Sequence, residues 1–134
     1  MEIDTLSRLD HAEVESFRPY EPDWESWIAS EAQGTIKLLA ARRDERLVGY
    51  LSFSLGFDLE SRGLLIANQL AWYVLPGQFG VGARMLDWLI VECKRLGVKF
   101  LYLSHPRRGR GESLGRFFER RGAMHTANLY TLPL

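Results

Sequence analysis

Residues 72–97 read WYVLPGQFGVGARMLDWLIVECKRLG, and this stretch decides the fold. An apolar run stops at Pro76, and three glycines, Gly77, Gly80 and Gly82, follow within six residues. Apolar residues then recur at helical spacing as far as the stop at Gly97: Met85, Leu86, Leu89, Ile90, Cys93 and Leu96. The stretch predicts a strand, a turn and a long helix. Three glycines give this turn more backbone freedom than a simple reversal of the chain needs.

The segments around this unit predict a mixed α/β fold. We expect a short helix over 9–18 with Asp10 as its N-cap, and a second helix from Asp23 to Gly34. Strands 35–42 and 46–57 have a hairpin pattern, and the uncharged run 63–75 is typical of a central strand buried on both faces. A strand at 99–104, a helix at 112–122 and a final strand at 123–132 follow. The predicted fold class is a twisted mixed sheet flanked by helices, with the strands on either side of the long helix parallel.

Composition points to an ordinary globular protein. The chain has 134 residues, of which 46% are hydrophobic and 25% charged, enough for one domain with a sizeable core. A single cysteine, Cys93, excludes an internal disulfide, and His11, His105 and His125 lack metal-ligand spacing. The N-terminus lacks the pattern of a signal peptide, and no uncharged run is long enough to cross a membrane. We therefore expect a soluble cytoplasmic protein with no metal site.

The glycine turn has the composition of an anion cradle. Unpaired N–H groups and the helix dipole make a helix N-terminus favourable for phosphate, and glycines let several amides approach one anion. The amides from Gln78 to Ala83 are the candidates, although a plain turn packed closely with small residues explains the same spacing. A nucleotide P-loop would need Lys and Ser or Thr after Gly82, and a dinucleotide site would need an acidic residue where Ser104 and His105 stand. Neither pattern fits.

The segment resembles motif A of the GCN5-related N-acetyltransferases, in which a strand ending V-x-P leads to Arg/Gln-x-x-Gly-x-Gly/Ala and a long helix. Val74-Leu75-Pro76 and the loop from Gly77 to Gly82 match it, and the order of elements is similar from Thr35 to Leu132. "LGRFFERRGA" resembles the last helix of that family. The compact size is similar to that of small acetyltransferase-like proteins of bacteriophages and bacteria. The resemblance implies a single domain of the GNAT-like acyl-CoA N-acyltransferase fold, with an acidic helical acceptor side over 1–34 and the sheet and acetyl-CoA core over 35–134.

The resemblance also implies a mechanism. Acetyl-CoA, as co-substrate, would place its pyrophosphate on the glycine turn and its pantetheine arm where two strands splay at a bulge near Trp72–Val74. The backbone N–H of Val74 would polarise the thioester carbonyl, and a primary amine would attack directly. The predicted cofactor-binding residues are Trp72, Tyr73, Val74, Gly77, Gln78, Phe79, Gly80, Val81, Gly82, Ala83, Ser104 and Phe118.

Two positions depart from the family pattern. Gly77 stands where Arg or Gln is usual, so one side-chain contact to the cofactor is missing or displaced. Phe118 stands where a tyrosine often protonates the leaving thiolate, and a phenyl ring cannot donate that proton. For the general base, Glu60 is our first choice, with Asp58 and His105 as alternatives.

Other functions remain open beside the leading one. The acceptor could be a small-molecule or protein amine, with Tyr20, Trp24 and Trp27 in its pocket, and a homodimer is conceivable. The rival is a non-catalytic GNAT-fold module that binds a protein partner or acyl-CoA. Arg107, Arg108 and Arg110 could be a solvated loop, a contact for the 3′-phosphate of CoA or a patch for an acidic partner. Zero net charge argues against nucleic acid, and nothing suggests a membrane partner.

Overall fold

The computed structural model describes residues 2–13, 21–105 and 111–134. Four helices and four strands lie in these ranges: α1 (Glu2–Glu13), α2 (Trp24–Ala32), β1 (Ile36–Arg43), β2 (Arg46–Phe57), β3 (Leu65–Val74), α3 (Val81–Leu96), β4 (Phe100–Tyr102) and α4 (Gly111–Glu119). The strands form one sheet in the order β1-β2-β3-β4. β1, β2 and β3 are antiparallel neighbours, whereas β3 and β4 are parallel across the α3 crossover, as predicted.

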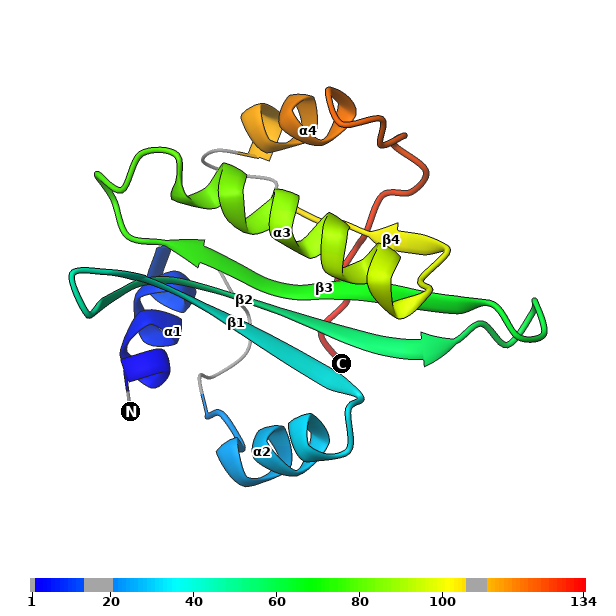
Figure 1. Ribbon diagram of the computed structural model, residues 1–134, viewed down its shortest axis with the longest axis horizontal. Coiled ribbons are helices and arrows are strands. Elements are labelled where there is room, and N and C mark those ends of the chain that lie inside the picture. The colour runs from blue at the N-terminus through cyan, green and yellow to red at the C-terminus, as the bar shows by residue number, and fades with distance from the viewer. Residues whose placement is uncertain (1, 14–20, 106–110) are drawn as a thin grey trace.

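Helices cover both faces of this sheet. Figure 1 shows α3 and α4 on one side, and α1 and α2 on the other. The core under α3 contains fully buried Leu51 and Phe53 from β2 and Leu86 and Leu89 from α3. A smaller cluster under α1 contains Leu6, Leu47, Tyr50 and Tyr73. Alternation along β2 sends Leu51 and Phe53 to the α3 side and Tyr50 to the α1 side.

Three predicted elements differ from the structure. The first helix begins at Glu2 rather than at residue 9, so Asp10 lies inside α1 and is not its N-cap. The final strand predicted over 123–132 does not form among the described residues, and residues 123–134 are exposed. The many charges of 2–13 hide its amphipathic pattern, and residues 123–132 have no strand partner among the described residues. β4 is also shorter than the predicted strand 99–104.

The second helix matches its prediction. Asp23 caps α2, because its side-chain oxygens accept hydrogen bonds from the Ser26 backbone N–H at 3.0 Å and from the Ser26 hydroxyl at 2.7 Å. The hairpin between β1 and β2 also forms, and it turns at Asp44 and Glu45, which both have positive φ. α2 lies over the same face of the sheet as α1 (Figure 1).

Candidate active site

The glycine turn leads into the first backbone N–H groups of α3. Gly80 is the left-handed N-cap of α3, with φ of 79°, and a Cβ built there would meet no atom within 4 Å. Arg84 N–H donates to the Gly80 carbonyl at 3.2 Å, so the N–H groups of Val81, Gly82 and Ala83 precede the hydrogen bonds within the helix. These three donors and the positive end of the helix dipole make an anion cradle.

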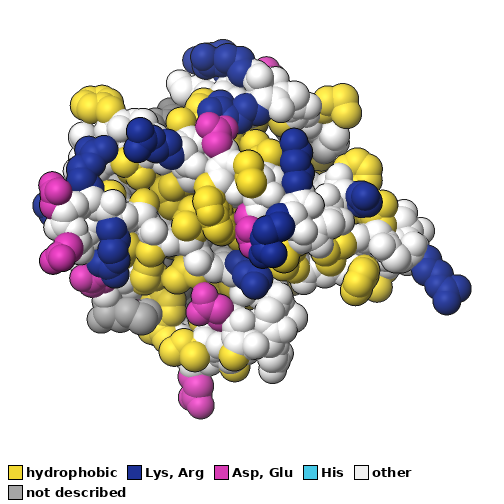
Figure 2. All heavy atoms as spheres, viewed as in Figure 1, with side chains coloured by type: hydrophobic (Ala, Val, Ile, Leu, Met, Phe, Trp, Pro, Cys, Tyr) yellow, Lys and Arg dark blue, Asp and Glu magenta, His cyan; other side chains and the backbone are white. Residues whose placement is uncertain are grey.

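Gln78 is engaged elsewhere in this turn. Its backbone N–H donates to the Leu75 carbonyl at 3.3 Å, and its side-chain oxygen accepts a hydrogen bond from Arg43 at 2.9 Å. The amides open to an anion therefore begin after Gln78. Arg43 comes from the end of β1, so it brings a cation beside the start of α3 that the sequence did not reveal. Figure 2 shows Lys and Arg side chains at this end of the molecule, together with Asp and Glu, and others over the rest of the same face.

Gly82 has a packing role as well. A Cβ at this position would lie 3.3 Å from Cζ2 of Trp72. The indole of Trp72 stacks on Phe118 of α4 at 5.9 Å between ring centroids and lies 6.2 Å from Phe117. Trp72 thus sits between the start of α3 and α4. Its buried indole N–H has no hydrogen-bond partner among the described residues.

β3 and β4 pair over a short segment only, and the part of β3 beyond it forms one side of a splay between the two strands. Only Ile66, Ala67 and Asn68 of β3 pair with β4, although β3 continues to Val74. Beyond this point the Gln69 side-chain oxygen accepts a hydrogen bond from the Ser104 backbone N–H at 3.0 Å, so a side chain bridges the widening gap. Among the described residues, no strand pairs with β3 past Asn68 on the β4 side.

A bulge accompanies the splay, but not where we predicted it. Ser52 pairs with Ala71 and Phe53 with Gln69, so Leu70 is the extra residue. The bulge expected near Trp72–Val74 therefore lies at Leu70, where the inserted residue shifts the register of the strand. Leu75 N–H donates to the Val48 carbonyl of β2 at 2.9 Å. Since successive N–H groups of a strand alternate in direction, the Val74 N–H points to the side of the splay.

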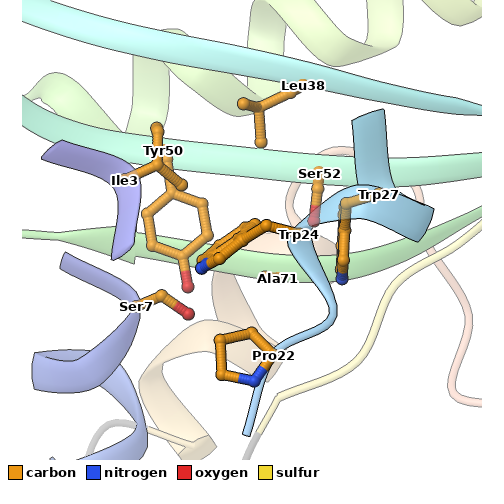
Figure 3. Close-up of a pocket in the computed structure, with 9 residues that line it drawn as sticks. All are labelled: Ile3, Ser7, Pro22, Trp24, Trp27, Leu38, Tyr50, Ser52 and Ala71. Carbon is orange, nitrogen blue, oxygen red and sulfur yellow. The ribbon is translucent and has the colours of Figure 1, made fainter. Parts of the chain in front are cut away.

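A pocket lies on the other face of the sheet, under α1 and α2 (Figure 3). Its volume is about 180 Å³. It is lined by Ile3, Ser7, Pro22, Trp24, Trp27, Leu38, Tyr50, Ser52 and Ala71. Ala71 follows the bulged Leu70 directly, so the pocket floor adjoins the splay. Ser52 is fully buried, and its hydroxyl has no hydrogen-bond partner among the described residues.

Two carboxylates of α1 hold aromatic side chains of this pocket. Asp4 accepts hydrogen bonds from the Trp24 indole N–H at 3.0 Å and from Arg8 at 2.9 Å. These two bonds, Arg8 first, lower the pKa of Asp4 and keep it ionised. Asp10 accepts a hydrogen bond from the Tyr50 hydroxyl at 3.1 Å. The pocket wall is therefore uncharged, with negative charge directly behind it.

The candidate bases lie in two separate parts of the molecule. Glu60 and Asp58 lie in the β2–β3 loop, where Glu60 N–H donates to the Asp58 carboxylate at 2.9 Å. This loop is at the opposite end of β3 from the glycine turn (Figure 1), roughly 30 Å away for a strand of this length. His105 lies on the α4 side, with its ring 6.4 Å from that of Phe118. None of the three lines the pocket.

Other predicted features are placed as follows. Tyr20, Arg107, Arg108 and Arg110 lie outside them. Within them, no group of His, Cys, Asp and Glu could hold a metal ion, and no helix is long and apolar enough to span a membrane. Cys93 is buried in the core, and desolvation raises its pKa to about 11, which fits a structural thiol.

Sequence reasoning missed Ser52 and the Asp10–Tyr50 pair. Ser52 carried a readable signal, because it is a polar residue inside the otherwise apolar run LVGYLSF. Asp10 and Tyr50 are forty residues apart, and only the fold brings them into contact. Asp10 was misplaced at a helix start, which concealed its place above the sheet.

The structure has many similar solved structures. A ribosomal-protein-alanine N-acetyltransferase from Brucella melitensis biovar Abortus 2308 has a TM-score of 0.74 at 19% identity, with 99% of this chain and 91% of that chain covered. An aminoglycoside acetyltransferase from an uncultured soil metagenomic sample has 0.78 at 13%, covering 98% and 90%. A predicted acetyltransferase with acetyl-CoA from Clostridium acetobutylicum has 0.71 at 14%, covering 98% and 86%. At these identities the likeness shows the fold alone.

The sequence itself gives the family. No curated protein matches it significantly. The acetyltransferase (GNAT) family matches residues 2–123, which include the α1 and α2 side, the whole sheet and α4. The chain therefore belongs to the GNAT acetyltransferase family.

Proposed function

We propose that this protein is an acetyl-CoA-dependent N-acetyltransferase that moves the acetyl group to a primary amine by direct attack in a ternary complex. The splay beside the bulge at Leu70 carries this proposal. It adjoins Ala71, which lines the pocket on one face of the sheet, and α3 begins on the other face, so in the proposed complex it would connect the two. Two ligands on opposite faces can meet there without an intermediate bound to the enzyme.

The chain's own groups fit acetyl-CoA on the α3 side. The open amides of Val81, Gly82 and Ala83 would hold the pyrophosphate, with Arg43 nearby as a positive charge. The unpaired backbone of Trp72 and Val74 would pair with the pantetheine amides as an added strand does. The bound co-substrate supplies the acetyl thioester, and the Val74 N–H would donate to its oxygen.

The remaining predicted contacts are part of the proposal. Ser104, tied to Gln69, borders the splay, and Phe118 would pack along the arm beside Trp72. Tyr73 contributes backbone only, because its side chain is buried on the α1 side. Gly77 and Phe79 flank the open amides, and Phe79 is almost fully exposed.

On the acceptor side we replace Glu60 as the proposed base. Glu60 lies at the wrong end of β3, whereas the Tyr50 hydroxyl lines the pocket and donates to Asp10. The Asp10 carboxylate is thus the acid–base group connected to the pocket through a hydroxyl. The division into an acceptor side over 1–34 and a cofactor side over 35–134 extends to Tyr50, Ser52 and Ala71, which the sheet contributes to the acceptor pocket.

The cellular setting is also proposed rather than established. We retain the cytoplasm as the expected location. A homodimer stays a prediction, for which the exposed apolar residues of the C-terminal segment, such as Leu129 and Tyr130, offer a surface. The similar structures include enzymes named for small-molecule amines and one named for a protein, and we propose a small-molecule amine because of the pocket under α1 and α2.

The test combines binding and turnover. Calorimetric titration with acetyl-CoA should show one site per chain, and thiol release over a panel of primary amines should identify an acceptor. Absence of binding at hundreds of micromolar acetyl-CoA would overturn the proposal.

A non-catalytic module is the second candidate, and Phe118 is the observation that favours it. A buried phenyl ring stacked on Trp72 stands where the proton donor for the thiolate is usual in the family. However, a thiolate whose pKa is near 8.5 can leave without a protein acid. Acetyl-CoA binding without thiol release for any amine in the panel would favour the module.

A further inference from the structure

We propose that the acceptor is a small primary amine carrying one ring-sized apolar group, and that the Ser52 hydroxyl is its hydrogen-bond partner in the pocket under α1 and α2. This inference rests on the proposed function and narrows its acceptor. Three observations support it: the volume of the pocket, its uncharged lining residues, and the buried Ser52 hydroxyl, which has no hydrogen-bond partner among the described residues.

The size of the pocket limits the body of the amine. Its volume is about 180 Å³. An apolar protein cavity of about 150 Å³ accommodates one benzene molecule. The pocket therefore has room for one ring and a short linker. An aminoglycoside with several sugar rings would have to leave most of its volume outside.

The walls favour an apolar ring with a cationic or polar end. Among the described residues every lining side chain is uncharged, and the apolar ones include Ile3 and Leu38 (Figure 3). Trp24 and Trp27 face the same space, with ring centroids 6.2 Å apart and planes tilted by 51°. Indole faces attract both aromatic edges and ammonium groups.

Hydrogen bonds fix the orientation of the Trp24 ring at the edge of the pocket. Its indole N–H donates to Asp4, and Asp4 is in turn held by Arg8. The carboxylate therefore orients the ring without lining the pocket. A polycation, which seeks several direct carboxylate contacts, finds none in the pocket wall.

Ser52 supplies the specific contact. Its hydroxyl is fully buried in the middle of β2, yet no described residue pairs with it. A buried hydroxyl without a partner is costly, so a ligand atom that pairs with it gains affinity. Figure 3 shows this hydroxyl directed into the space that Trp24 and Trp27 border. Ser52 pairs with Ala71, next to the bulge, so an amine nitrogen held by Ser52 lies at the side of the splay.

The experiment measures amine binding in the absence of acetyl-CoA. 2-Phenylethylamine, spermidine, kanamycin and a tripeptide with N-terminal alanine are titrated by calorimetry and by quenching of tryptophan fluorescence. We expect 2-phenylethylamine to bind most tightly. Ser52→Ala should weaken it about five- to tenfold, the size of one hydrogen bond. Ser54→Ala, on the same strand but outside the pocket, is the matched control and should bind normally.

A second variant tests the volume. Ala71→Leu adds three carbons at the floor of the pocket and should abolish 2-phenylethylamine binding while acetyl-CoA binding is kept. Tighter binding of kanamycin, spermidine or the peptide than of 2-phenylethylamine would overturn the proposal. Equal affinity of Ser52→Ala and the unaltered protein would overturn it too.

The two proposals fail separately. Ser52-dependent binding of 2-phenylethylamine without thiol release from acetyl-CoA supports the pocket assignment and contradicts the proposed function. Thiol release with kanamycin or the peptide alone supports the function and overturns the pocket assignment.

Discussion

The two faces of the sheet are built differently. On the α3 face, Leu51, Phe53, Leu86 and Leu89 are fully buried, and α3 presses closely enough on β3 that Gly82 leaves no free room beside Trp72. On the α1 face the buried cluster is small, α2 has no buried residue, and a pocket stays open between the helices and the sheet. The tightly packed face suits a ligand that is constant in the family, and the open face suits one that varies.

Deleting a large side chain from each core tests this difference. It has the largest effect that we expect on the free energy of unfolding. Leu89→Ala should lower the free energy of unfolding by about 3–5 kcal/mol, since a cavity in the packed α3 face cannot collapse. Leu6→Ala should lower it by only about 2 kcal/mol, because α1 can settle into the space. Urea titration measures both values. Equal losses would mean that the two faces are equally rigid.

The glycine turn offers a second comparison, between two glycines, with a smaller expected effect on stability. Gly80 and Gly63 have nearly the same φ, +79° and +78°, and a Cβ at either would meet nothing within 4 Å. Alanine at each should cost about 1–2 kcal/mol of backbone strain. Only Gly80→Ala should weaken acetyl-CoA binding, about tenfold or more, because it displaces the amides at the start of α3. Calorimetry on both variants checks this, and an equal loss of affinity in Gly63→Ala would remove the turn from the site.

The sequence predicted the α3 face far better than the α1 face. The glycine turn, α3 and β3 follow from contiguous signals: a break at Pro76, apolar spacing of 3.6 residues and a stop at Gly97. The pocket under α1 and α2 instead joins α1, α2 and the middle of the sheet, which are far apart in the chain. Contacts such as Tyr50 with Asp10 have no local pattern, so only the fold reveals them.

Other differences between prediction and structure also have local causes. Glu60 precedes the central strand in sequence, but a strand of ten residues carries its start away from its end, so Glu60 lies far from the glycine turn. The bulge was placed near Trp72–Val74 from the family likeness, while the register fixes it at Leu70. Side-chain hydrogen bonds such as that of Gln78 with Arg43 depend on pairing between distant loops.

A substitution at Tyr50 distinguishes a structural role of its hydroxyl from a role in proton transfer. Tyr50→Phe removes the hydrogen bond to Asp10 and should cost about 1 kcal/mol of stability. If the hydroxyl connects the amine to Asp10, thiol release should fall by about 100-fold while acetyl-CoA affinity is unchanged. Steady-state kinetics over pH 6–9 measure this. An unchanged rate would exclude Tyr50 from the proton path.

The smallest expected effect is the response to acid, which both faces share. Hydrogen bonds from Arg8 and Trp24 lower the pKa of Asp4, and a hydrogen bond from Arg121 lowers that of Asp87. A carboxylate whose pKa is lowered by folding stabilises the fold above its unfolded pKa, about 3.9, and that contribution is lost as pH falls through the folded value. Unfolding free energy should be level above about pH 5 and decline below about pH 4. Asp4→Asn and Asp87→Asn should each make the decline shallower in urea titrations, and a decline that begins near pH 6 would point to other groups.

The most direct test of the two-faced site is a pair of titrations followed by amide resonances in NMR. The account predicts that acetyl-CoA shifts the amides of Val81, Gly82 and Ala83, and that 2-phenylethylamine shifts those of Ser52 and Ala71. Leu70, at the bulge between the two sites, should respond to both. An acetyl-CoA titration that leaves the amides at the start of α3 unchanged would contradict it.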